Sequence, residues 1–145
     1  MVNYLLVLHL LGASIWTGGH LILALVVLPK VLSSRNLDAL LQFEGQFEKI
    51  GMPALGLQIL TGLWMAYKLL PNVGAWFAFD NDISKLIGIK LALLMMTALV
   101  AIHARFWVIP RLSTNNLNGF SINIILVTLF SVAFVVVGTL FRSGL

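Results

Sequence analysis

Three histidines and a lysine lie inside strongly apolar stretches of this sequence, and their side chains are the best suited to chemistry. His9 and His20 fall in the first stretch, and Lys90 and His103 fall in the third. Polar side chains are costly inside a bilayer, so residues kept there usually have a function. Imidazole binds both copper and haem iron. The first expectation is therefore a metal or haem site within the membrane.

His9, Trp16 and His20 share one face of a predicted helix. Trp16 and His20 follow His9 by seven and eleven residues, and both offsets return to within about 20° of the same azimuth. Gly12 and Gly19 lie on or beside this face. Either the histidines hold a ligand and the glycines make room for a flat group, or the glycines allow close helix packing and each histidine donates to a neighbouring oxygen. The histidines are about 16 Å apart along the axis, so they cannot share one metal ion.

Depth in the membrane relates these residues to the third stretch. The first and third spans run in the same direction, so His20 can lie level with His103, and His9 with Lys90, at about 1.5 Å per residue. We expect one His/His level and one His/Lys level. Lys90 and His103 differ by roughly 140° in azimuth, so they cannot both face the first helix. Lys90 has the alternative of extending to the interface. Met96 continues the His103 face and is more simply a packing residue than a ligand.

Four apolar stretches are each long enough to cross a bilayer. The chain has 145 residues, of which 60% are hydrophobic and 10% charged, whereas soluble domains carry about 25% charged residues. We predict an all-α membrane protein with a single domain over residues 1–145. Its four transmembrane helices form a bundle, with spans at about 2–28, 52–70, 84–109 and 120–141.

Prolines and polar residues predict where the spans begin and end. Pro29 and Pro110 predict the ends of the first and third spans, and Pro53 suits the first turn of the second. The third span has several candidate N-caps: Asp80, Asp82 and Ser84.

The connection over residues 31–51 predicts an amphipathic connector helix on the membrane surface, either separate from the second span or continuous with it. Glu44 and Glu48 are one turn apart in it, and Met52 follows. If this helix folds over the mouth of the bundle as a lid, its carboxylates would pair with Arg105 or line an entrance to the histidines. A solvated surface face is the alternative.

Composition and motifs exclude several classes of function. The net charge is +4 and no cysteine is present, so thiolate metal sites are excluded. No basic run of the nucleic-acid type occurs, and hydrolase, nucleotide-binding and kinase motifs are absent. The expected partner is the lipid bilayer, with a homo-oligomer as a further option. Five basic residues near one set of connections against four near the other favour both termini outside.

The first stretch resembles the first helix of the copper-resistance D (CopD) family. The string is His9-Leu-Leu-Gly-Ala-Ser-Ile-Trp16-Thr-Gly-Gly19, followed by Leu28-Pro29. Other segments resemble the same family: Phe43-Glu44 to Phe47-Glu48-Lys49-Ile50, Pro53-Ala54, Leu60-Thr61-Gly62 and Lys90-Leu91. The resemblance covers most of the chain and implies copper handling in a bacterial-type inner (cytoplasmic) membrane. The spacing from His9 to Trp16 and the later Lys90 also resemble the four-helix protoporphyrinogen oxidases of the HemJ type, which implies haem at His9 and Lys90.

Three functions compete at this point. The first prediction is haem b, held for electron transfer or redox chemistry as in a haem-dependent oxidoreductase, and its candidate residues are His9, His20, His103, Lys90, Trp16, Gly12 and Gly19. The second is copper binding or transport, with candidate ligands His20, His103, His9, Met52 and Met96. The third is an accessory subunit whose helices only pack. The sequence identifies no catalytic residue, and it names neither a redox partner nor a metallochaperone.

Overall fold

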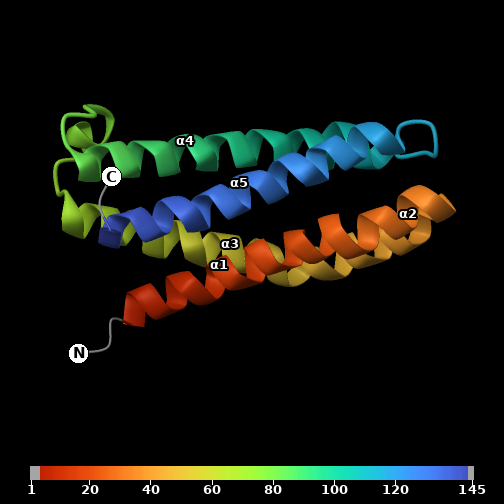
Figure 1. Ribbon diagram of the computed structural model, residues 1–145, viewed down its shortest axis with the longest axis horizontal. Helices are drawn as coiled ribbons and strands as arrows, with labels where there is room; N and C mark the ends of the chain where they lie inside the picture. Colours follow the sequence, from red (N-terminus) through yellow and green to blue (C-terminus); the bar gives the residue numbers. More distant parts are fainter. Residues whose placement is uncertain (1–3, 144–145) are drawn as a thin grey trace.

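Four long apolar helical segments run side by side along the molecule, as the computed structural model shows for residues 4–143 (Figure 1). Each is long and apolar enough to cross a membrane: Tyr4–Ser34, Leu37–Leu69, Asp82–Arg111 and Leu117–Ser143. No strand occurs in the described part of the chain. The predicted four-helix membrane fold is confirmed. The first segment ends later than predicted, the second begins earlier, and the third and fourth are longer at both ends; the predicted start at residue 2 lies outside the described residues.

The first and third segments are each made of several helical pieces. The first comprises α1 (Tyr4–Ile22), the π-helical turn η1 (Leu23–Val27) and α2 (Leu28–Ser34). The third comprises α4 (Asp82–His103), the π-helical turn η3 (Ala104–Val108) and the 3₁₀ turn η4 (Ile109–Arg111). The remaining elements are α3 (Leu37–Leu69), the 3₁₀ turn η2 (Val73–Phe77) and α5 (Leu117–Ser143).

Pro29 does not end the first helix, contrary to the prediction. A proline ring clashes with the carbonyl four residues earlier, which belongs to Leu25 here and to Phe106 for Pro110. Both of those residues lie inside the π-helical turns η1 and η3. We attribute the continuation to the wider turn, which moves the obstructing carbonyl away from the ring. The first segment therefore continues to Ser34.

The amphipathic connector is not a separate surface helix. Its first residues end α2, and its residues 37–51 form the first half of α3, which runs unbroken over 33 residues with Pro53 in its interior rather than in its first turn. The chain reverses instead at Arg35, which adopts a left-handed φ of 57°, and at Asn36, whose side chain accepts from the Ala39 amide at 3.3 Å. Of the two interpretations of residues 31–51, the continuous helix is correct.

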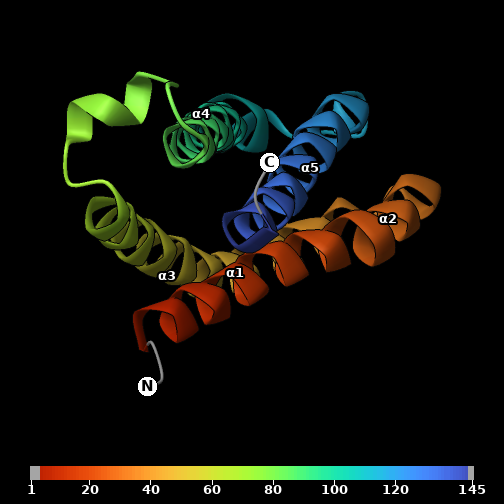
Figure 2. The same ribbon diagram turned by 60° about the vertical axis from the view of Figure 1, so that its left-hand side comes forward.

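The helices are arranged as two hairpins. α1 packs against α3, α4 packs against α5, and α1 and α5 join the two pairs. α3 and α4 do not pack along their length, and Figure 2 shows them diverging on either side of the connection through η2. This unpacked seam between α3 and α4 is referred to below as the α3–α4 seam.

Polar residues hold the connection between α3 and α4 in place. The N-cap of α4 is Asn81, whose side chain accepts from the Ser84 amide at 2.9 Å, so none of the three predicted caps has that role. Ser84 instead accepts from the Phe79 amide at 3.0 Å. Trp76 is buried and donates to the Leu70 carbonyl at 2.8 Å. The connection is thus packed against the start of α4.

Candidate functional site

A cavity of about 340 Å³ lies between the two hairpins. All four segments contribute to its walls, and on α1 its lining begins at Trp16. The lining comprises Trp16, His20, Leu23, Glu44, Phe47, Glu48, Gly51, Met52, Ala101, Ile102, Ala104, Arg105, Phe106, Ile109, Phe120, Asn123, Ile124 and Val127. Five residues singled out from the sequence are therefore brought to one place: Trp16, His20, Glu44, Glu48 and Met52.

His20 presents one ring nitrogen without a protein partner. The residue is 8% exposed, and its Nδ1 lies 2.9 Å from the Trp16 carbonyl oxygen. A carbonyl can only accept, so Nδ1 carries the proton and the neutral ring has its lone pair on Nε2. Nε2 has no hydrogen-bond partner among residues 4–143. A backbone carbonyl on one nitrogen commonly orients a histidine whose other nitrogen binds a metal.

Aromatic rings fix the orientation of His20. Its ring centroid is 4.4 Å from that of Trp16 and 5.2 Å from that of Phe47, which meets it edge-on at 84°. The Phe47 ring in turn lies over two glycines: a Cβ on Gly19 would overlap it, and one on Gly51 would lie 2.9 Å from it. The flat group beside Gly19 is thus a phenyl ring of the protein itself.

Gly12 also serves helix packing. A Cβ at this position would lie 2.9 Å from the Ala54 carbonyl oxygen of α3. The close approach of α1 and α3 therefore depends on a residue without a Cβ at position 12. Of the two interpretations of the glycine-rich face, the contacts of Gly12 and Gly19 support close packing, which leaves less room for a macrocycle beside α1.

Charged residues from α3 and the third segment line the cavity where these two segments meet. Arg105 Nη1 lies 3.0 Å from Glu48 Oε2, which confirms that a carboxylate of this segment pairs with Arg105. Glu44 lies within electrostatic range of both Glu48 and Arg105. These carboxylates belong to the wall formed by α3, because that helix lies along α1 instead of crossing the mouth of the bundle.

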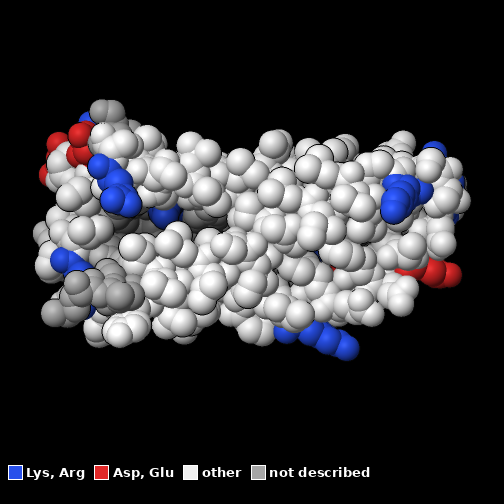
Figure 3. Space-filling model, turned by 60° about the horizontal axis from the view of Figure 1, so that its bottom comes forward, with Lys and Arg blue, Asp and Glu red and all other residues white. Residues whose placement is uncertain are grey.

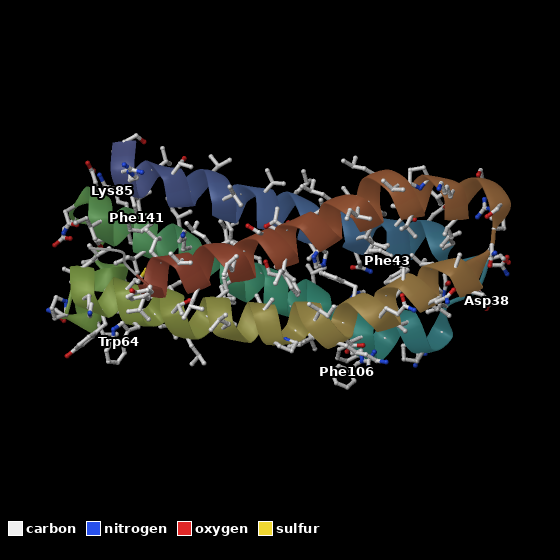
Figure 4. The ribbon with its side chains drawn as sticks, turned by 90° about the horizontal axis from the view of Figure 1, so that it is seen from below. Asp38, Phe43, Trp64, Lys85, Phe106 and Phe141 are labelled. Carbon is white, nitrogen blue, oxygen red and sulfur yellow. The ribbon has the colours of Figure 1, made fainter. Side chains whose placement is uncertain are left out.

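The cavity opens at the α3–α4 seam. Met52 of α3 and Ile102 and Phe106 of the third segment line it, and their side chains are also 53%, 48% and 68% exposed. Figure 4 shows Phe106 pointing away from the bundle. The Glu48–Arg105 ion pair spans this opening. A ligand would reach His20 by passing between α3 and the third segment, at the level of that ion pair.

His103 and Met96 lie outside the cavity. His103 is exposed, and its ring stacks on that of Trp107 with centroids 6.1 Å apart. Met96 is 46% exposed. The expected His20/His103 level does not bring the two rings into one site, because α4 turns Lys90 toward the interior and thereby directs His103 outward. The azimuthal conflict between these two residues is resolved in favour of Lys90.

His9 and Lys90 form a second polar level toward the other end of the bundle. His9 Nδ1 lies 2.9 Å from Thr61 Oγ1, and Lys90 is within electrostatic range of His9. Hydroxyl groups also link α1 to α5: Thr128 donates to the His20 carbonyl at 3.2 Å and Thr17 to the Ser131 carbonyl at 3.4 Å.

Phe47 and Asn123 line the cavity but were not among the predicted site residues. A signal for Phe47 exists in the sequence: Gly51 follows it by one helical turn and leaves its ring room to lie flat. Asn123 offers no comparable signal. Within residues 4–143, no three side chains of His, Cys, Asp or Glu converge as a metal-holding group.

Fold and cavity together define a class: a small four-helix membrane protein with a buried histidine facing a cavity that opens at a helix seam. The family model for copper resistance protein D matches residues 41–141, and the chain belongs to the CopD family. That range begins inside α3, so His9, Trp16 and His20 lie before it. Searches of curated proteins and of solved structures found no match.

Proposed function

We propose that this CopD-family chain binds copper as cargo in the His20 cavity, within a bacterial cytoplasmic membrane. The observation that carries the proposal is the unpartnered Nε2 of His20, which the hydrogen bond from Nδ1 to the Trp16 carbonyl leaves available as a ligand. Neutral imidazole is among the ligands that suit copper.

Other lining residues fit the same ion. Met52 offers a thioether, which favours Cu(I), and Glu44 and Glu48 offer carboxylates that attract a cation. The copper resistance family to which the chain belongs also supports this cargo. Since one histidine lines the cavity, the ion would rely on His20 together with Met52 or a carboxylate.

Copper content tests this proposal directly. Detergent-purified protein is loaded with copper under reducing conditions, desalted, and analysed for metal per chain. We expect about one ion per wild-type chain. In His20→Ala we expect the copper affinity to fall at least tenfold, which corresponds to a loss of about 1.4 kcal/mol in binding free energy. His103→Ala is the matched control, because its ring lies outside the cavity. Equal losses in the two variants would contradict the proposal.

Haem b in the same cavity is a second candidate. It is favoured by the mostly apolar lining around His20 Nε2, which suits an axial ligand to haem iron. Bound haem would supply one-electron redox chemistry, with His20 holding it and the surrounding side chains excluding water. The HemJ-type resemblance implies haem at His9 and Lys90, at the other end of the bundle, and that stays a prediction.

A visible spectrum of the same preparation distinguishes the two candidates. A Soret band with sharp α and β bands on reduction, lost in His20→Ala, supports haem b. A colourless protein with stoichiometric copper supports the first proposal. A protein with neither supports the accessory role, in which the helices only pack.

A further inference from the structure

Lys90 is an intramembrane cation without a counter-ion in the described part of the chain. It lies eight residues after Asp82, or about 12 Å along α4, and its side chain is half-buried. Within residues 4–143 its ammonium forms neither a hydrogen bond nor an ion pair. Lys85, five residues earlier on the same helix, pairs with Asp82 at 3.5 Å.

The ammonium lies against an aromatic ring and a glycine of α5. Lys90 Nζ lies 5.3 Å from the centroid of the Phe141 ring. On the same helix, Gly138 presents no side chain, and a Cβ there would lie 3.5 Å from Nζ. Figure 4 places Phe141 and Lys85 at the end of the bundle opposite Asp38. An aromatic face attracts a cation but leaves its positive charge uncompensated.

His9 adds an acceptor at this level. Thr61 donates its one hydroxyl proton to the Leu57 carbonyl at 2.7 Å, so its oxygen accepts from His9 Nδ1 at 2.9 Å. The neutral His9 ring therefore has its lone pair on Nε2. Gly62 leaves room for that ring, since a Cβ there would lie 3.1 Å from it. One charged donor and one neutral acceptor thus occupy the same level.

We propose that Lys90 and His9 form a binding site for an oxyanion, a phosphate or carboxylate group that enters the bundle at this end. The oxygen atoms accept from Lys90 Nζ and compensate its charge, and a protonated oxyanion also donates to His9 Nε2. An anionic lipid headgroup and a free anion share this chemistry. The site is independent of copper or haem at His20.

Ligand-dependent thermal stability tests the proposal. Protein in a neutral detergent is melted with phosphatidylglycerol or phosphatidylcholine, and separately with inorganic phosphate, acetate or chloride at constant ionic strength. We expect phosphatidylglycerol, phosphate or acetate to raise Tm by several degrees in the wild type and in the control Lys85→Met, and to leave Lys90→Met unchanged. A response to phosphatidylglycerol alone identifies the lipid headgroup, and a response to phosphate or acetate identifies a free anion.

A second variant keeps the charge and tests the space beside it. Gly138→Val places a side chain against Nζ and should lower the response to the same probe, whereas Lys90→Arg should retain it. Only the shift caused by the probe is compared, so a change in intrinsic stability does not affect the result. Equal shifts in the wild type and Lys90→Met, or no shift with any probe, would overturn the proposal.

Discussion

A single hydrogen bond decides what His20 offers the cavity. Because Nδ1 donates to a backbone carbonyl of its own helix, Nε2 is directed away from α1. Phe47 and Trp16 hold the ring on either side. Trp16 Nε1 is itself buried without a partner in the described residues, a cost of about 1–3 kcal/mol for such a donor. The Trp16 ring packs against the His20 ring and helps to hold its orientation.

The contact between Gly19 and Phe47 gives a prediction at the same scale. In Gly19→Ala the new methyl group overlaps the Phe47 ring, so we expect a loss of about 1–3 kcal/mol in unfolding free energy. Gly18→Ala is the matched control, because nothing lies within 4 Å of its Cβ, and it should be neutral or stabilising by up to about 1 kcal/mol. Unfolding in mixed detergent micelles measures both.

The double variant Gly19→Ala/Phe47→Ala provides the decisive comparison. Removing the ring removes the overlap, so the cost of Gly19→Ala should largely disappear in that background. If Gly19→Ala costs the same with and without the ring, the two residues are not in contact as described.

The sequence predicted which residues belong to the candidate site better than it predicted the directions in which their side chains point. The shared face of His9, Trp16 and His20 followed from spacing alone, and Trp16 and His20 do line one cavity. The sequence also showed that Lys90 and His103 cannot both face α1. It could not say which one does, because that depends on Gly138 and Phe141 of another helix.

At the scale of elements, the helices were predictable and their ends were not. Apolar runs predict spans, but Pro29 was interpreted as an end, and the π-helical turn before it allows the helix to continue. No pattern in Leu23–Val27 distinguishes a π-helical turn from an α-helical one. The same arrangement precedes Pro110. A π-helical turn thus begins shortly after His20 in the first segment and directly after His103 in the third.

The α3–α4 seam gives a prediction at this scale. The Glu48–Arg105 pair spans the opening, and its side chains are 34% and 53% exposed, so it contributes no more than about 1 kcal/mol. Arg105→Gln should therefore preserve the fold and widen access. The chain has no cysteine, so Ala101→Cys, in the cavity wall, is a clean reporter. We expect a several-fold faster reaction of this thiol with a small alkylating reagent in Arg105→Gln.

Glu48→Gln removes the other partner and should accelerate labelling to the same extent. The double variant should add nothing further, because the pair is already broken. A cysteine placed at exposed Leu99, outside the cavity wall, controls for general loosening of the helices. If labelling at that position accelerates equally, the ion pair does not act on the seam.

At the scale of the whole molecule, lipid completes the bundle. The hairpins α1–α3 and α4–α5 are joined chiefly by the packing of α1 against α5, and large apolar side chains face outward along all four segments. Figure 3 shows charged side chains mostly toward the two ends of the face in view, with a wide uncharged band between them. Helices of 27 to 33 residues exceed the hydrocarbon thickness of about 30 Å, so they tilt or extend beyond it.

The distribution of charge predicts the orientation of the molecule in the membrane. α1 begins and α5 ends at the same end of the bundle (Figure 1). Five basic residues lie toward the opposite end: Lys30, Arg35, Lys49, Arg105 and Arg111. On the side of the termini, Lys90 is half-buried in the bundle, which leaves Lys68, Lys85 and Arg142 near the surface. Because basic residues favour the cytoplasmic side, we expect both termini outside.

Fusions to the C-terminus measure this orientation in a bacterial host. Alkaline phosphatase, which requires an oxidising compartment, should be active there, and green fluorescent protein should stay dark. In this orientation the Glu48–Arg105 opening and the His20 cavity lie nearer the cytoplasm, so the copper proposed to bind there would load from that side, while the Lys90 level lies nearer the outer surface. A fluorescent fusion with inactive phosphatase would reverse both assignments and place the cavity nearer the outer surface.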